Sequence, residues 1–437
     1  MAASSSFEGS GSSGNTSQPR ERENVTRMDP KFYEAAAQGD IEFFKVHGTH
    51  PNHVPLTPNK NTVLHIYITS LDVAKAESPT NFVDEVLKIH PLLLWQGNAN
   101  DEIPLHIAAR YGHRAVIEFL LERANLIHQD LESGFRSARE MLRMTNKERD
   151  TALHEAVRYN HLEAAKLLME EDPEFSYFAN GAGETPLYMA AERNFRDIVI
   201  TIIDTCKSPA YNGPLGRTAL HAAASWEEPE VIELIQRIEG ISKEADQKGW
   251  TPLHLAAHYN KIKSTMLLLE YDRDVAYMKD KDGRTALHIA AHRGHHMVME
   301  KIISSCPDCC ELVDKRGWNV LHFAADDPIL DDFEAYQHIK LIIGAILENR
   351  SLGNLLNQKD TDGNTPLHYL LRRSSCWLDT NDHWHTIGKD NLFFDPRVDK
   401  MAFNNENLHA WEIALTVTDV SIQKVTYIIL LFFIPQK

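Results

Sequence analysis

The sequence contains little cysteine. Its 437 residues include only five, at Cys206, Cys306, Cys309, Cys310 and Cys376. So few cysteines in a chain of this length exclude the disulfide-rich secreted class and favour a reducing compartment. The first 27 residues also lack the apolar segment behind a basic start that a secretory signal needs. We therefore expect a cytoplasmic protein.

Basic residues and catalytic signatures are also scarce. Lys and Arg number 45 against 62 acidic residues, which gives a formal charge of −17. Because sequence-independent phosphate binding depends on clustered Lys and Arg, we expect no nucleic acid partner. The phosphate-loop, G-x-S-x-G, H-E-x-x-H and kinase H-R-D signatures do not occur. The sequence predicts no enzyme, no catalytic residue and no cofactor.

The C-terminal end lacks an apolar run long enough to cross a membrane. The run at residues 427–434, from Tyr427 to Ile434, has eight apolar residues. As a helix it would be about 12 Å long, against a hydrocarbon core of about 30 Å. Peripheral association with a membrane through this run is the expectation.

The chain does contain a repeated pattern, Thr-x-Leu-His. Its last position falls at His65, His106, His154, Tyr188, His221, His254, His288, His322 and His368. Successive positions between His154 and His322 are 33 or 34 residues apart, and the other intervals are 41, 48 and 46. A period of about 33 residues with T-P-L-H-x-A is the signature of ankyrin repeats, which this sequence resembles.

The residues of each repeat suit a turn followed by two antiparallel helices. In one unit, Asp246 can bind the amides of a tight turn and Gly249 can adopt a positive φ. Thr251 then suits the N-cap and Pro252 the first helical position. No single repeat can bury both helices, so neighbouring repeats must stack around one elongated core. We predict an all-α ankyrin-repeat solenoid of about ten repeats.

The composition also divides the chain. We predict a disordered Ser/Gly-rich tail over residues 1–27, the repeat array over 28–375, an insert or linker over 376–400, a degenerate last repeat over 401–418 and an apolar tail over 419–437. The two long intervals inside the array contain inserts, at 129–150 and about 326–338, which should loop from one face.

Three phrases point to a particular kind of ankyrin protein. MDPKFYEAAAQGD, REMLRMTNKERDTALHEAVR and RVDKMAFNNENLHAWEIA together span about 28–418. They resemble phrases of the plant ankyrin family of the accelerated-cell-death type, in which a Pro-Gly-Gly element and a multi-pass membrane region follow the array. The resemblance implies a role in plant defence, cell death or stress signalling, at the cytosolic face of the plasma membrane. No Pro-Gly-Gly follows Ala414, so a fragment or splice form of such a membrane protein is the alternative.

The histidines and cysteines invite a metal hypothesis. Equivalent histidines in adjacent repeats lie about 10 Å apart, whereas zinc needs its ligands within about 2.0–2.3 Å. We therefore interpret them as structural hydrogen-bonding residues. Cys306 and Cys309 form one C-x-x-C, near His292, His295 and His296, but a second ligand pair is missing. The sequence predicts no metal site, and a zinc-dependent ligase is the enzyme alternative.

Candidate binding residues follow the turn glycines. A stacked array forms a concave surface, and the residue after the glycine is Arg217, Trp250, Arg284 or Trp318 in four repeats. Arg and Trp dominate interface hot spots, so these four residues are a candidate protein-binding patch. The alternative is that each Trp packs on its own hairpin and stem. Proteins that bind the concave surface are the expected partners.

Overall fold

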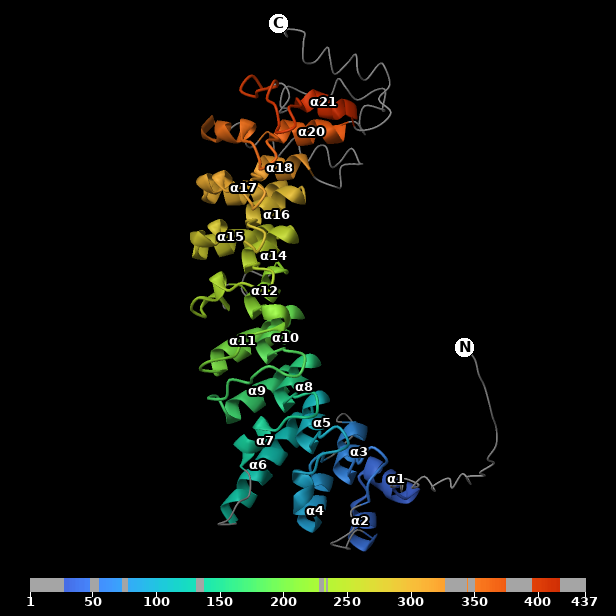
Figure 1. Cartoon of the computed structure of the whole chain (residues 1–437). Helices are drawn as coiled ribbons and strands as arrows, with labels where there is room; N and C mark the ends of the chain where they lie inside the picture. The colour runs from blue at the N-terminus through green and yellow to red at the C-terminus, as the bar shows by residue number, and fades with distance from the viewer. Residues whose placement is uncertain are drawn as a thin grey trace, which may run out of the picture.

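A computed structural model describes residues 27–47, 55–72, 78–130, 137–227, 235–326, 350–374 and 395–416, together with residues 232 and 344. Over these residues the regular elements are α-helices and short 3₁₀ helices. The helices pair along the chain and stack into an elongated column (Figure 1). The predicted all-α solenoid is therefore confirmed.

The first helices of the repeats form one side of the column. They are α1 (Pro30–Gln38), α3 (Val63–Ser70), α5 (Pro104–Arg110), α8 (Ala152–Arg158), α10 (Pro186–Glu192), α12 (Ala219–Ala224), α14 (Pro252–His258), α16 (Ala286–His292), α18 (Val320–Ala325), α20 (Pro366–Ser374) and α21 (Ala410–Thr416). Each packs against the first helix of the next repeat. The column curves, and this row of helices lies along its concave side (Figure 1).

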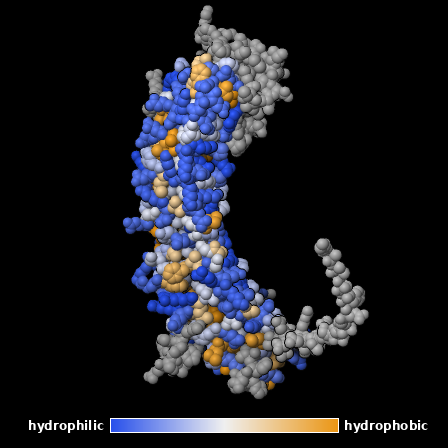
Figure 2. Space-filling view, viewed as in Figure 1, coloured by the Kyte–Doolittle hydropathy of each residue, from blue (hydrophilic) through white to orange (hydrophobic). Residues whose placement is uncertain are grey.

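The second helices form the opposite, convex side. Those described are α2 (Ile41–His47), α4 (Asn81–Ile89), α6 (Arg114–Asp130), α9 (Leu162–Glu171), α11 (Arg196–Thr205), α15 (Ile262–Tyr271) and α17 (His296–Ser305). Each except α4 packs against the first helix before it, and α4 packs against α2. The molecular surface in this view is largely hydrophilic, with scattered apolar residues (Figure 2).

Paired alanines allow the first helices to approach closely. Ala256 and Ala257 of α14 have no exposed surface, and Ala290 and Ala291 of α16 are equally buried. A leucine from the same helices, such as Leu253, is fully buried in the shared core. The buried residues form one cluster that runs from Ala35 to Ala410, as expected when neighbouring repeats share a core.

The hairpins between repeats also lie very close together. Gly249 has φ +81°, and a Cβ atom there would lie 2.8 Å from the backbone nitrogen of Lys281 in the next hairpin. Gly249→Ala is therefore expected to lower the free energy of unfolding by about 2–4 kcal/mol, from backbone strain plus overpacking. Gly240→Ala is a matched control, because Gly240 has φ +77° but nothing within 4 Å of its Cβ position. Urea unfolding measures both, and equal losses would show that the hairpins are not tightly packed.

The interval 129–150 differs from the expected projecting loop. The helix α6 extends to Asp130, and α7 (Ala138–Arg143) follows within the interval. Met141 and Leu142 of α7 are buried, and the helix packs against α6 and α9. The apolar side chains of α7 thus hold this segment on the column.

Several predictions concern residues outside the described ranges. For the predicted disordered tail, residues 1–26 lie outside these ranges. For the two predicted inserts, residues 327–338 and 376–394 lie outside them, and so does the whole apolar tail over 419–437. The last repeat is described up to residue 416, where α21 packs on α20.

Candidate binding surface

Eight histidines of the repeated pattern connect each repeat to the next. In α14, the Nδ1 atom of His254 accepts the Thr251 N–H at 3.1 Å, and Nε2 donates to the Arg284 carbonyl of the next repeat at 3.1 Å. Equivalent contacts to the hairpin of the next repeat are made, at 2.6–3.3 Å, by His65, His106, His154, His221, His322 and His368. His288 instead contacts the Leu312 carbonyl, two residues before Asp314 of the next hairpin, at 3.0 Å. Both ring nitrogens are occupied by backbone groups. The predicted structural role of these histidines is confirmed.

These contacts require a neutral imidazole. A backbone N–H can only donate and a carbonyl can only accept, so Nδ1 carries no proton and Nε2 carries one. Protonation of Nδ1 would place its N–H donor opposite the backbone N–H donor, and that hydrogen bond would be lost. Burial lowers the pKa of all eight side chains, and it lowers the pKa to about 4 for His154, His221, His288 and His322.

Two repeats depart from this arrangement. Tyr188 occupies the histidine position in α10, and there the Oγ1 atom of Thr185 accepts the Tyr188 N–H at 3.3 Å and donates to the Asn212 carbonyl at 2.8 Å. In the last repeat Glu412 occupies the position, and its carboxylate accepts the His409 N–H at 2.7 Å. A different side chain thus satisfies the helix start in each case.

A second set of histidines connects three of the repeats to the repeat before each. His113, His161 and His295 lie near the start of a second helix. Their ring nitrogens contact the carbonyls of Ile68, Arg110 and Ala257 at 3.0, 3.0 and 2.8 Å. Sequence analysis missed these contacts. The signal was a constant offset, since each of the three follows a pattern histidine by seven residues.

The four predicted binding residues lie at the hairpins. Trp250 is half-buried, and its Nε1 atom donates to the Asp280 carboxylate of the next repeat at 3.2 Å. Arg284 donates to the same carboxylate at 2.9 Å. Arg217 has its Nε atom 3.7 Å from the Asp246 carboxylate. These three side chains keep some exposed surface while they support the hairpins.

Trp318 is more deeply placed. Only 6% of the residue is exposed, and its Nε1 atom donates to the Asp360 carboxylate at 3.0 Å. The Arg316 guanidinium lies 3.6 Å from the ring centre. Trp318 therefore offers little surface to a partner. Both indoles bind the hairpin of the following repeat. Protein binding through Arg217, Trp250, Arg284 and Trp318 stays a prediction.

Truncation of the two tryptophans separates a packing role from a binding role. Trp318→Ala is expected to lower the free energy of unfolding by about 3–5 kcal/mol, because it removes a buried ring. Trp250→Ala should lower it less, because Trp250 is half-buried. Urea denaturation measures both. If the double variant stays folded and partner capture is unchanged, the two tryptophans are not part of the binding surface.

The cysteine cluster is buried. Cys306, Cys309 and Cys310 are 3%, 0% and 1% exposed. Burial raises the pKa of the Cys306 thiol, which disfavours the thiolate that binds zinc. Among the described residues, no group of three His, Cys, Asp or Glu side chains is arranged to hold a metal ion.

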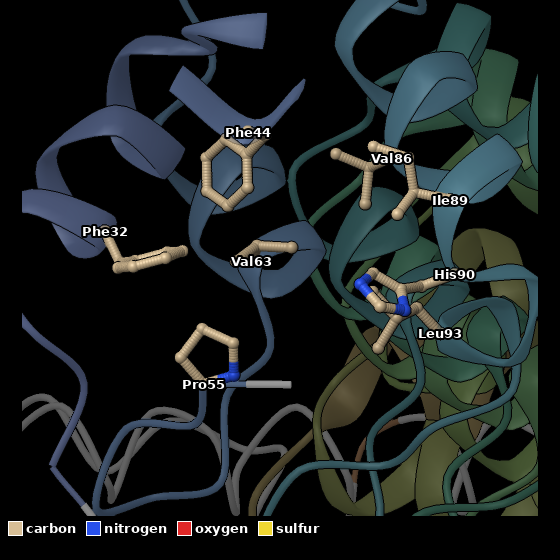
Figure 3. Close-up of a pocket in the computed structure, with 8 residues that line it drawn as sticks. All are labelled: Phe32, Phe44, Pro55, Val63, Val86, Ile89, His90 and Leu93. Carbon is tan, nitrogen blue, oxygen red and sulfur yellow. The ribbon is translucent and has the colours of Figure 1, made fainter. Parts of the chain in front are cut away.

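Two pockets lie at the ends of the array. The N-terminal one has a volume of only about 20 Å³ and is lined by Phe32, Phe44, Pro55, Val63, Val86, Ile89, His90 and Leu93 (Figure 3). The C-terminal one, of about 330 Å³, lies between the last two repeats and includes His368, Arg372 and Asn405. The first is too small for a ligand. The second extends along the side of the column where the first helices lie.

The most regular exposed feature is a row of large side chains at the ends of the first helices. Each member follows its pattern residue by five positions. Tyr111, Tyr159, Trp226 and Tyr259 are 44%, 51%, 42% and 48% exposed, and Arg193 and Arg293 occupy the same position in the other two repeats. We call these six residues the inner row. Sequence analysis did not single it out, although its constant offset was visible.

A charged network supports one end of the inner row. Arg110, beside Tyr111, donates to Glu155 at 2.8 Å and also binds Glu102. Arg158, beside Tyr159, donates to Glu155 at 3.0 Å and binds Asp150 at 2.8 Å. The three carboxylates are nearly fully buried, whereas the two arginines keep about a quarter of their side-chain surface. Paired charges across three repeats thus fix the arginines next to the row.

Family models for ankyrin repeats match the chain. One, described as ankyrin repeats in three copies, matches residues 74–179, 133–212 and 205–278, and another, described as ankyrin repeats in many copies, matches 253–304. Together the matches extend over more than half of the sequence. The chain belongs to the ankyrin-repeat proteins. Their repeats form protein-interaction scaffolds, which are typically non-catalytic.

Individual relatives are more distant. The chain is 25% identical over 183 residues to Protein ACCELERATED CELL DEATH 6 of Arabidopsis thaliana, a match that covers 41% of this chain and 26% of that protein. It is 28% identical over 197 residues to the Probable 26S proteasome regulatory subunit p28 of Saccharomyces cerevisiae. That match covers 43% of this chain and 78% of that protein. The chain thus spans about a quarter of the length of the Arabidopsis relative. Among solved structures, the ankyrin repeat domain of Bcl-3 matches with 25% identity and a TM-score of 0.44, over 51% of this chain and 94% of that one.

In the part of the chain that the structure covers, no helix combines the length and apolar character needed to cross a membrane. The run 427–434 lies outside that part.

Proposed function

We propose that this protein is a non-catalytic binding scaffold in plant defence, cell-death or stress signalling. The distant similarity to the Arabidopsis relative and the three phrases between residues 28 and 418 support the setting. We further propose that it acts in the cytoplasm, at the cytosolic face of the plasma membrane.

The inner row is the observation that supports binding at the concave side. Four large aromatic side chains stand exposed at equivalent positions, although they could be polar without loss to the core. A few hot-spot residues supply most of the binding energy at protein interfaces, and Trp, Tyr and Arg are enriched among them. By contrast, the pattern histidines are committed to contacts between repeats. The surface available for a partner is therefore the inner row with the hairpins beside it.

Affinity purification from plant tissue tests this function. The tagged chain is compared with a Tyr159→Ser/Tyr259→Ser variant and with a convex-side control, Met266→Ser/Met297→Ser, whose side chains are 40% and 45% exposed on α15 and α17. We expect mass spectrometry to find partners with the wild type and the control that the inner-row variant loses. Loss in the control alone would place binding on the convex side and contradict the proposal.

The alternative is a fragment or splice form of a multi-pass membrane protein. Carbonate extraction of plant membranes distinguishes the two. A peripheral protein is released by carbonate, whereas a product that continues into a membrane region stays in the pellet.

A further inference from the structure

The inner row has an order as well as a position. Along the column it reads Tyr111, Tyr159, Arg193, Trp226, Tyr259 and Arg293, so two aromatic residues and then one arginine occur twice. The first helices that carry these residues, α5, α8, α10, α12, α14 and α16, pack on one another in this sequence. The row therefore crosses six successive repeats without a gap.

The spacing of the row selects an extended partner. Packed helices lie about 8–10 Å apart, so each member of the row is about that far from the next. A polyproline II helix advances about 3.1 Å per residue and turns once in three residues, so every third residue faces the same way at intervals of about 9.3 Å. One polyproline II strand can therefore present one residue to each member of the row. An α-helix, with about 5.4 Å per turn, matches this spacing less well.

The arginine side chains of the inner row favour a negatively charged partner. Arg193 is 31% exposed and lies 3.6 Å from the Glu192 carboxylate, whereas Arg293 is exposed beside His258, with an Nη2 to Nε2 distance of 3.2 Å. Burial and the nearby Arg293 lower the pKa of His258 to about 4, so at neutral pH this contact leaves the arginine charge uncompensated. The chain as a whole carries −17, so the cationic surface around Arg293, with Lys248 and Arg217 nearby, is a local exception. The overall charge also disfavours nucleic acid.

We propose that the inner row binds a proline-rich, acidic polypeptide segment in the polyproline II conformation. Every third residue of the segment faces the row, and these residues are in order two prolines, one acid, two prolines and one acid. The prolines pack on the aromatic rings, as in other aromatic-lined grooves that recognise such segments. The acids pair with Arg193 and Arg293. This inference rests on the proposed function, because it names the chemistry of the partner at the concave side.

Fluorescence anisotropy with designed peptides tests the inference. The probe has Pro, Pro, Glu, Pro, Pro and Glu at every third position, and it is made in both chain directions. One control peptide has lysine in place of glutamate, and another has glycine in place of proline. We expect the full-length chain to bind the glutamate peptide at least about tenfold more tightly than either control, which is about 1.4 kcal/mol.

Charge reversal in the protein gives the matched variant. Arg193→Glu/Arg293→Glu should lose the glutamate peptide and gain the lysine peptide, whereas Met266→Ser/Met297→Ser should bind as the wild type does. Circular dichroism confirms that both variants fold. Equal binding of all three peptides, or displacement by single-stranded DNA but not by unlabelled peptide, would overturn the inference. If the peptides do not bind but natural partners still require Tyr159 and Tyr259, the proposed function survives and only the partner chemistry is wrong.

Discussion

Lowering the pH from 7 to 5 is expected to destabilise the array strongly. His154, His221, His288 and His322 have an ordinary pKa of 6.5 when unfolded and about 4 when folded. The folded state therefore binds fewer protons, so the stability is fully present above pH 6.5 and is lost as the pH falls toward 4. Relative to pH 7, each histidine then contributes a loss of about 2 kcal/mol at pH 5, or about 7–8 kcal/mol for the four.

The summed loss for the four histidines is comparable to the whole free energy of unfolding of an ordinary domain, which is about 5–15 kcal/mol. The other four pattern histidines shift in the same direction. Urea titrations at several pH values measure the effect. The urea midpoint should fall steadily as the pH drops from 6.5 toward 4. A midpoint that is constant between pH 7 and pH 5 would show that the buried imidazoles do not control stability.

The second large effect is expected from a single histidine. In His288→Leu, the Thr285 N–H, which is 3.0 Å from Nδ1, and the Leu312 carbonyl, which is 3.0 Å from Nε2, lose their partner in a buried place. Unsatisfied buried groups cost about 1–3 kcal/mol each, so we expect a loss of about 3–5 kcal/mol at pH 7.

The pH dependence separates this effect from a packing defect. The wild type itself loses about 2 kcal/mol at His288 between pH 7 and pH 5, so the gap between variant and wild type should narrow by that amount. The exposed His47→Gln control should show neither effect. If the gap stays constant with pH, His288 is not held neutral by its contacts.

Much of the fold could be predicted because each repeat contains its own local instructions. Thr251 and Pro252 begin a helix and Gly249 closes the turn before it, and these effects act over a few residues. The period of the pattern then indicates stacking. The interval 129–150 was harder, because the side chains of Met141 and Leu142 reveal their burial only once α6 and α9 are in place.

The candidate surface was less predictable for the same reason. The sequence shows that Trp318 follows a turn glycine, but not that the Asp360 carboxylate 42 residues later binds its indole. The pattern histidines were interpreted correctly as structural, yet the target of Nε2 lies in the next repeat. The inner row was visible as a constant offset, but its significance depends on which side of the helix is exposed. The roles of Trp318, of the pattern histidines and of the inner row all depend on contacts between repeats, which the sequence alone does not show.

Site-specific photo-crosslinking tests the central claim, that a polypeptide binds the concave side, most directly. A photoreactive phenylalanine analogue is placed at Tyr159 or Tyr259 on the inner row, and at Met266 or Met297 on the convex side, and plant cells expressing each chain are irradiated. The account predicts covalent adducts with a partner protein from the inner positions and few from the convex ones. Adducts from Met266 and Met297 alone would contradict it.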